Sequence, residues 1–184
     1  MDVQQIEQTL TNRQLPDLLP PDEGWVLPHY SGLSIANIPA TVAALLGTSL
    51  PGALPALPEE IWADWRPGLR RVVLVIIDAL GYRMLQRMSA SGDTHAFSDL
   101  ARAGRLIPIT SVFPSTTDAA LVSLSTGRPP AEHGWLAYTM YLRELGVAAN
   151  AILLSSVWTR KADELLDWGL ESSSLIPIPR LAER

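Results

Sequence analysis

The sequence predicts an α/β fold with a mainly parallel sheet flanked by helices. Residues 72–77, VVLVII, form an unbroken apolar run rich in β-branched residues, and such a run without polar alternation is typical of a strand buried on both faces. The pattern becomes helical after Asp78, and a second apolar segment at 106–113, LIPITSVF, precedes another helical stretch. Strands that alternate with helices in this way indicate an α/β layer.

The first third of the chain predicts two helices joined by Pro-rich connectors. A short helix is expected at 6–15, and the Pro and Gly residues after it predict an arm that runs over the surface. A second helix is expected at 34–46. Asn37 would be its N-cap, Pro39 would lie in its first turn and Gly47 would end it.

We therefore divide the chain into residues 1–33, an N-terminal helix and Pro-rich arm, and residues 34–184, which would hold the α/β domain. The other expected elements are, in chain order, helices at 80–88, 97–103 and 117–126, a strand at 148–154, a helix at 162–168 and a first helical turn at 179–184.

Composition indicates a globular chain and excludes several classes of function. The 184 residues are 47% hydrophobic and 18% charged, which suits a single packed domain. A net charge of -5 argues against a nucleic-acid-binding surface, because binding the phosphate backbone needs clustered Lys and Arg. The absence of cysteine excludes disulfides, thiolate metal sites and cysteine nucleophiles.

The sequence contains no recognisable targeting or membrane segment. Its start, MDVQQIEQTL, has neither a basic region nor an apolar stretch of the kind found in secretory signals. The apolar run at 72–77 is far shorter than the roughly 20 residues that a membrane helix needs. We therefore expect a cytoplasmic protein without a membrane partner, and its oligomeric state stays open.

Asp78 is the first candidate for chemistry because it directly follows the most apolar run. In an open α/β sheet, ligands bind at the carboxyl ends of the strands, where this residue is expected to lie. Two interpretations stay open from the residues alone. Asp78 either caps the helix that follows or is a carboxylate ligand of a metal ion.

Thr116 and Thr117 are the second candidates, because they precede a helix of small and aliphatic residues that ends at Gly127. The N–H groups of a helix start bind phosphate oxygens without help from Lys or Arg, and a bound metal can activate a hydroxyl as a nucleophile. A plain N-cap at Ser115 or Thr116 explains the same pattern. Asp118 suits the helix start electrostatically but would repel an incoming phosphate.

Two further residues near this helix have simpler explanations. A lone histidine such as His133 is more often a hydrogen-bonded loop residue than a metal ligand, and Arg128 is expected to serve the C-terminal end of the helix. The sequence contains no G-x-S-x-G elbow, no phosphate-binding G-x-x-x-x-G-K-[ST] loop, no G-x-G-x-x-G fingerprint and no H-E-x-x-H motif.

Together, the segments VVLVIIDALGYRML and FPSTTDAALVSLSTGRPPAEHGWLAY resemble the alkaline phosphatase superfamily, most closely its type I phosphodiesterase and nucleotide pyrophosphatase branch. In that branch an Asp after the first strand binds one of two metals. A Thr or Ser at a following helix start is the nucleophile, ten residues before the Gly of an [ST]-G turn. Asp78 matches the metal ligand. Thr117, ten residues before Gly127, matches the nucleophile, and Thr116 is the alternative. The run at 130–134, PAEHG, matches the P-x-x-H-G of the family.

The resemblance covers most of the chain from about residue 30 onward and implies a doubly wound α/β fold. It also implies two divalent metal ions, zinc being the expected metal, with Asp78 and Thr117 among the ligands. One ion would activate the Thr117 oxygen, both would hold the phosphoryl group, and a phospho-threonine intermediate would then be hydrolysed. The implied substrate is a small phosphorylated molecule, either a phosphodiester or a nucleotide pyrophosphate.

The chain departs from the family downstream of the nucleophile. The family completes its metal site there with Asp-x-x-x-His, Asp-His and a final His, whereas this chain has only His29, His95 and His133. We therefore expect the N-terminal half of a longer enzyme, possessing too few metal ligands to act alone. The alternative is a truncated or degenerate non-catalytic α/β module that binds a phosphorylated ligand or a partner. A phosphomutase or a sulfatase of the same superfamily is disfavoured, because the sequence around Thr117 matches neither.

A half domain would expose an apolar sheet edge where its missing strands pack. Material of this length should therefore aggregate or increase the fluorescence of a hydrophobic dye. A monodisperse monomer with a sharp cooperative melt would contradict this prediction.

Overall fold

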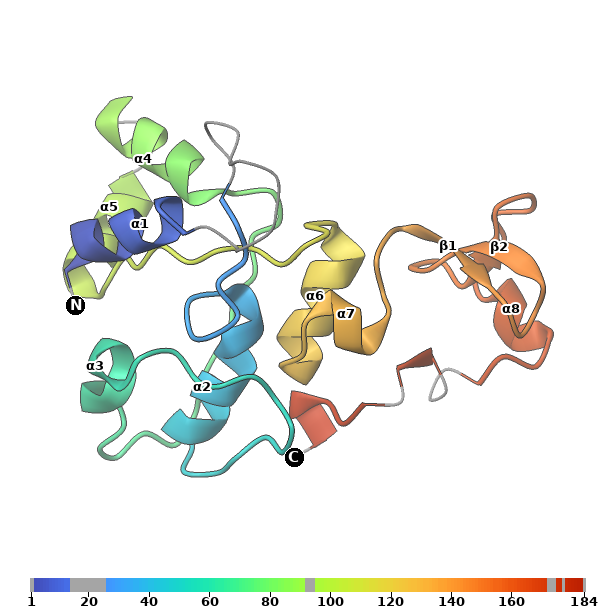
Figure 1. Cartoon of the computed structure of the whole chain (residues 1–184), viewed down its shortest axis with the longest axis horizontal. Helices are drawn as coiled ribbons and strands as arrows, with labels where there is room; N and C mark the ends of the chain where they lie inside the picture. The colour runs from blue at the N-terminus through green and yellow to red at the C-terminus, as the bar shows by residue number, and fades with distance from the viewer. Residues whose placement is uncertain (1, 14–25, 92–94, 172–174, 177, 184) are drawn as a thin grey trace.

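The computed structural model describes residues 2–13, 26–91, 95–171, 175–176 and 178–183. Most of its elements are helices, and one small sheet lies at the end of the molecule opposite α1, α4 and α5 (Figure 1). The α-helices are α1 (Val3–Thr11), α2 (Ile38–Leu45), α3 (Glu59–Trp62), α4 (Tyr82–Ser91), α5 (His95–Ala103), α6 (Thr117–Thr126), α7 (Pro130–His133) and α8 (Glu164–Asp167). Short 3-10 helices are η1 (Ile35–Asn37), η2 (Ala63–Trp65) and η3 (Leu181–Glu183).

The larger apolar cluster lies between α1 and the segments around α2 and α3. Ile6 and Leu10 on the buried face of α1 pack with residues from three other places in the sequence. Those residues are Leu33, Leu45, Ile61 and Trp62. The cluster therefore joins the N-terminal helix to the first half of the chain.

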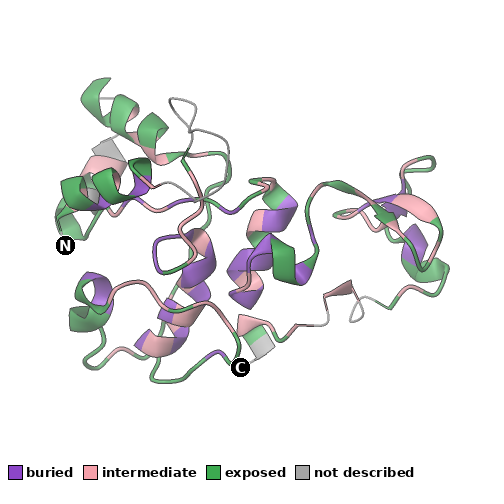
Figure 2. Cartoon of the chain, viewed as in Figure 1, coloured by how far each residue is buried: buried purple, intermediate pink, exposed green. Residues whose placement is uncertain are grey.

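A second, smaller cluster places α6 against η1. Ala119 of α6 is fully buried against Ala36 of η1 and against Val112. Small side chains at this contact let the two helical segments approach closely. Buried residues are accordingly concentrated along α2, α6 and α7 (Figure 2), and α2 and α6 lie side by side at the centre of the molecule (Figure 1).

Asn37 stands at the N-cap position of α2 as predicted, and Pro39 lies in the first turn. The Asn37 side chain, however, makes no capping hydrogen bond to α2. Its Oδ1 accepts the Ser34 N–H at 2.8 Å, and its Nδ2 donates to the carbonyls of Tyr30 and Pro55, each at 2.8 Å. Because the amide is fully buried, all of these bonds replace bonds to water.

The sheet differs from the predicted one. It has three short antiparallel strands, β1 (Thr139–Leu142), β2 (Val147–Asn150) and β3 (Ser155–Ser156), in the order β1-β2-β3. Thr139 pairs with Asn150, and Asn150 pairs with Ser155. The strand expected at 148–154 thus overlaps β2 only in part, and a doubly wound parallel sheet is not confirmed.

The apolar run at 72–77 belongs to no strand among the described residues, so the prediction of a central buried strand is wrong for this structure. Val73 and Val75 are 85% and 75% exposed. The segment at 106–113 forms a single parallel bridge, between Thr110 and Ser34. An apolar pattern shows that a segment favours burial, but a strand also needs a hydrogen-bonded neighbour, and the described chain supplies none for 72–77.

More of the predicted helices than of the predicted strands are present in the structure. The helices expected at 34–46, 80–88, 97–103 and 117–126 are confirmed as α2, α4, α5 and α6, apart from their exact ends. The helices expected at 6–15 and 162–168 are shorter, α1 and α8, and the turn expected at 179–184 is the 3-10 helix η3. The surface arm expected after the first helix lies mostly at 14–25, outside the described residues. Among the described residues, no helix combines the length and apolar character needed to cross a bilayer.

Gly127 and Gly134 form a matched pair for testing how the end of α6 is specified. Both have left-handed backbone angles, φ 70° and 76°. A side chain at Gly127 would place its Cβ 2.7 Å from the Ala53 Cβ, whereas nothing lies within 4 Å of a Cβ at Gly134. We expect Gly134→Ala to cost about 1 kcal/mol of unfolding free energy and Gly127→Ala clearly more, measured by urea denaturation. Equal losses would show that the contact with Ala53 adds nothing.

Candidate active site

The two threonines at the start of α6 have different surroundings. Thr116 is the N-cap, and its Oγ1 accepts the Ala119 N–H at 3.4 Å while donating to the Leu136 carbonyl at 2.9 Å. Thr117 is the first helical residue, and its side chain lies on the exposed surface. The Thr116 hydroxyl is therefore engaged in local structure, whereas that of Thr117 faces outward.

The Thr117 hydroxyl meets the carboxylate of Asp78. Its Oγ1 donates to Asp78 Oδ2 at 3.2 Å, across 39 positions of sequence. The two side chains that the resemblance implies as metal ligands therefore lie next to each other. Asp78 does not lie at the carboxyl edge of a sheet as predicted, because the segment before it forms no strand among the described residues.

The backbone after Asp78 turns sharply. Ala79 has a left-handed φ of 60°, unusual for a residue with a side chain, and its N–H donates to Asp78 Oδ1 at 2.9 Å. Helix α4 begins only at Tyr82, so Asp78 does not occupy its N-cap position. The interpretation of Asp78 as a helix cap is thus wrong, and both of its oxygens have partners that hold the carboxylate toward α6.

The chemistry of this pair fits part of a metal site. A carboxylate and a hydroxyl are oxygen donors of the kind that divalent cations bind, and both side chains are accessible from solvent. The structure brings together two such donors. Within the described ranges, no group of three or more His, Cys, Asp or Glu side chains is arranged to hold an ion. Asp78 and Thr117 therefore supply two oxygen donors that fit a divalent ion.

Asp118 is directed away from this exposed pair. Its side chain is only 6% exposed, and it lines an apolar pocket together with Leu121 and Val122 of α6. Burial raises the pKa of the Asp118 carboxyl, and its own backbone N–H acts in the opposite direction. The repulsion of phosphate that the sequence predicted for Asp118 is consequently weakened by its orientation.

His133 is buried and hydrogen-bonded on both ring nitrogens. Its Nδ1 accepts the Trp135 N–H at 3.1 Å, so the ring proton resides on Nε2, which lies 2.9 Å from Ser123 Oγ. This contact joins α7 to the middle of α6. Burial lowers the pKa of His133, while the Ala119 carbonyl and Glu132 oppose that shift. His133 is hydrogen-bonded as expected, but it lies at the end of α7 and not in a loop, and sequence spacing did not identify Ser123 as its partner.

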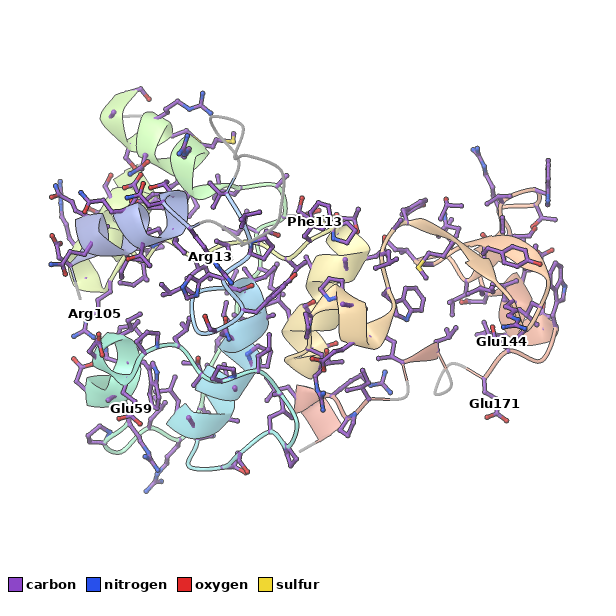
Figure 3. The ribbon with its side chains drawn as sticks, viewed as in Figure 1. Arg13, Glu59, Arg105, Phe113, Glu144 and Glu171 are labelled. Carbon is purple, nitrogen blue, oxygen red and sulfur yellow. The ribbon has the colours of Figure 1, made fainter. Side chains whose placement is uncertain are left out.

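Two further contacts lie at opposite ends of α6, one before its start at Phe113 and one after its end at Arg128. Phe113, beside the start of α6, is 67% exposed, and its N–H donates to the Tyr30 hydroxyl at 3.0 Å (Figure 3). Arg128, expected to serve the end of α6, forms an ion pair with Glu132 of α7 instead. The contact between Phe113 and Tyr30 joins residues 83 positions apart and has no local signal, whereas the four-residue spacing of Arg128 and Glu132 is a local signal that the sequence reasoning did not use.

Comparison with known proteins gives one informative result. Residues 72–162 match the profile of the family described as type I phosphodiesterase / nucleotide pyrophosphatase, and the matched segment contains both Asp78 and Thr117. No curated protein and no solved structure matches the chain significantly. The match confirms the resemblance that the sequence motifs indicated.

The buried His133 should make stability depend on pH. The unfolded chain protonates this ring below about pH 6.5, whereas the folded chain does so only at lower pH, so stability falls as the pH drops from about 6.5 toward the lowered pKa. In His133→Gln the amide can still donate to Ser123 but cannot titrate. We expect the wild type to lose more stability than this variant between about pH 7.5 and pH 5, by urea midpoints. Parallel pH profiles for the two proteins would contradict the assignment.

Proposed function

We propose that this chain, in which residues 72–162 show the signature of the type I phosphodiesterase / nucleotide pyrophosphatase family, supplies the nucleophile and a metal ligand of a phosphoric-ester hydrolase. The family supports hydrolysis of the phosphodiester or pyrophosphate kind. The roles of individual residues rest on one observation, the hydrogen bond from Thr117 Oγ1 to Asp78 Oδ2 at the start of α6.

The surroundings of the two threonines support Thr117 as the nucleophile. Reaction at Thr116 would require its hydroxyl to leave both the Leu136 carbonyl and the Ala119 N–H. Thr117 is exposed, and its bond to Asp78 orients the hydroxyl while leaving oxygen lone pairs available to phosphorus. An attacking oxygen must be held in position but not buried, and only Thr117 meets both conditions.

Electrostatics at the helix start support a phosphorylated substrate. The unpaired N–H groups of the first turn of α6 carry a partial positive charge close to Thr117, which suits binding of phosphoryl oxygens. The chain has a net charge of -5, so this local field matters more than overall attraction. A small phosphate ester can reach this surface, whereas a polyanion would meet general repulsion.

Asp78 and Thr117 would be ligands of one divalent ion. When bound, such an ion lowers the pKa of the attacking hydroxyl and neutralises charge that develops on the phosphoryl group. We also propose that the complete site binds two ions and that the metal is zinc.

The covalent step exchanges one ester for another. Thr117 Oγ1 forms a bond to phosphorus as the bond to the departing alkoxide or phosphate breaks. The hydroxyl proton, which faces Asp78 Oδ2, passes to solvent at this exposed position. Water then attacks the phospho-threonine, releases the phosphate product and returns the Thr117 hydroxyl.

A second candidate function uses the same helix start without chemistry. Only two oxygen donors converge among the described residues, and a non-catalytic module would bind a phosphorylated ligand through the N–H groups of α6 alone. Such a module needs neither the Thr117 hydroxyl nor a metal, so variants at both positions separate the two functions.

Paired threonine variants test the nucleophile in the intact protein that contains this sequence. Thr117→Ala should abolish turnover of bis(4-nitrophenyl) phosphate, because it removes the attacking oxygen, and it should leave the fold intact. Thr116→Ala is the matched control, since it loses the N-cap and should cost about 1 kcal/mol of stability with activity retained. The measurements are initial rates with zinc present and urea denaturation of each variant.

Asp78→Asn completes this experiment. The amide keeps the shape of the side chain but binds a divalent ion more weakly, so zinc content should fall and excess zinc should restore part of the rate. Full activity of Thr117→Ala combined with loss in Thr116→Ala would move the nucleophile one residue earlier. Activity in both threonine variants would contradict threonine catalysis, and phosphate binding without turnover in the wild type would favour the non-catalytic module.

A further inference from the structure

A pocket behind the start of α6 contains a buried acidic group that the proposed chemistry does not use. Its volume is about 260 Å³, and it lies between α6, the loop after β2 and the segment that leads to η3. Its walls are almost entirely apolar and include Leu121, Val122, Trp135, Ile152, Leu154 and Leu175. A cavity of about 150 Å³ lined by such residues already accepts benzene, so this one admits an aromatic ring with a short chain.

Asp118 is the acidic group in this pocket. It is 94% buried, its residue exposure being 6%, and its Oδ2 has no hydrogen-bond partner among the described residues. Glu164, a comparably buried acid, shows the usual arrangement, because its carboxylate accepts hydrogen bonds from Ser156 and Thr159. A buried carboxyl oxygen without a partner is costly, and its presence points to a donor that the described residues do not supply.

No described basic side chain donates to Asp118 Oδ2. Arg128 pairs with Glu132, and Lys161 pairs with Asp167, so these two cations are engaged elsewhere. The pocket therefore combines an apolar volume with one carboxyl oxygen, Asp118 Oδ2, that has no described hydrogen-bond donor. An anion would be repelled, and a purely apolar molecule would leave Asp118 Oδ2 unpaired.

We propose that this pocket binds a primary ammonium group carried on a small apolar body, with the ammonium donating to Asp118 Oδ2 and the body packed against Leu121, Val122 and Trp135. The inference stands on the pocket and its unpaired oxygen and does not need catalysis. If the proposed function also holds, the ammonium group would belong to the phosphate ester that Thr117 attacks, because Asp118 is the next residue in the chain. This extension rests on the proposed function.

The test measures binding directly, without turnover. 2-Phenylethylammonium chloride is titrated into the intact protein by isothermal calorimetry, beside 2-phenylethanol, which has the same body without the charge, and 3-phenylpropionate, which has the opposite charge. We expect saturable binding of the ammonium, at least tenfold weaker binding of the alcohol and none of the anion, because a charge-assisted hydrogen bond is the stronger kind.

Three variants locate the binding site. Asp118→Asn keeps the size of the side chain and should weaken ammonium binding by tenfold or more. Leu121→Trp should also block binding by filling the pocket, and it should fold because Leu121 is 44% exposed. Asp167→Asn, an exposed acid outside the pocket, is the matched control and should bind as the wild type does. Thermal melts confirm that each variant is folded.

The outcomes separate this inference from the proposed function. Lack of saturable ammonium binding by the folded wild type, equal binding of the alcohol, or unchanged binding by Asp118→Asn would each overturn the pocket assignment. Thr117→Ala should leave ammonium binding intact, so a failure of catalysis does not affect this result. Binding that persists in Leu121→Trp would place the ligand elsewhere and would equally overturn the assignment.

Discussion

The geometry around Thr117 depends on the buried side-chain amide of Asn37. This amide joins the backbones of Tyr30, Ser34 and Pro55, three points that are separated in the sequence. The amide holds η1 in place, and Ala119 of α6 packs against Ala36 of η1. Loss of the amide would leave several buried polar groups without partners, and each of them would carry a desolvation cost.

The bridge between Ser34 and Thr110 extends this constraint to the segment that leads into α6. The Thr110 hydroxyl accepts the His29 N–H at 2.8 Å and donates to the Leu33 carbonyl at 3.1 Å, while its backbone also pairs with Leu33 and Ile35. These bonds fix where residue 110 lies and therefore where the helix begins seven residues later. The start of α6 is thus positioned by hydrogen bonds to the first part of the chain.

The two faces of the α6 start are chemically different. Thr117 is exposed and meets Asp78, whereas the neighbouring Asp118 is buried in an apolar pocket. Successive residues in a helix point about 100° apart, so one turn can present a hydroxyl to solvent and a carboxyl to the interior. One helix start can therefore serve both an exposed reacting centre and a recognition pocket behind it.

Local sequence by itself determined the helices and the identity of the candidate pair. The Pro39, Gly127 and Thr116 signals identified the ends of α2 and α6, because caps and left-handed turns depend on nearby residues. The resemblance to the phosphodiesterase family singled out Asp78 and Thr117, and the family match to residues 72–162 confirms that resemblance.

Tertiary structure alone decided which strands form and which polar groups meet. The run at 72–77 has the composition of a buried strand yet is exposed, because strand pairing requires a neighbour that no local pattern can specify. The contact between His133 and Ser123 and the pocket around Asp118 likewise join residues from separate elements. Helix signals are local because their hydrogen bonds link residues four apart, whereas sheets and pockets depend on distances that only the folded chain sets.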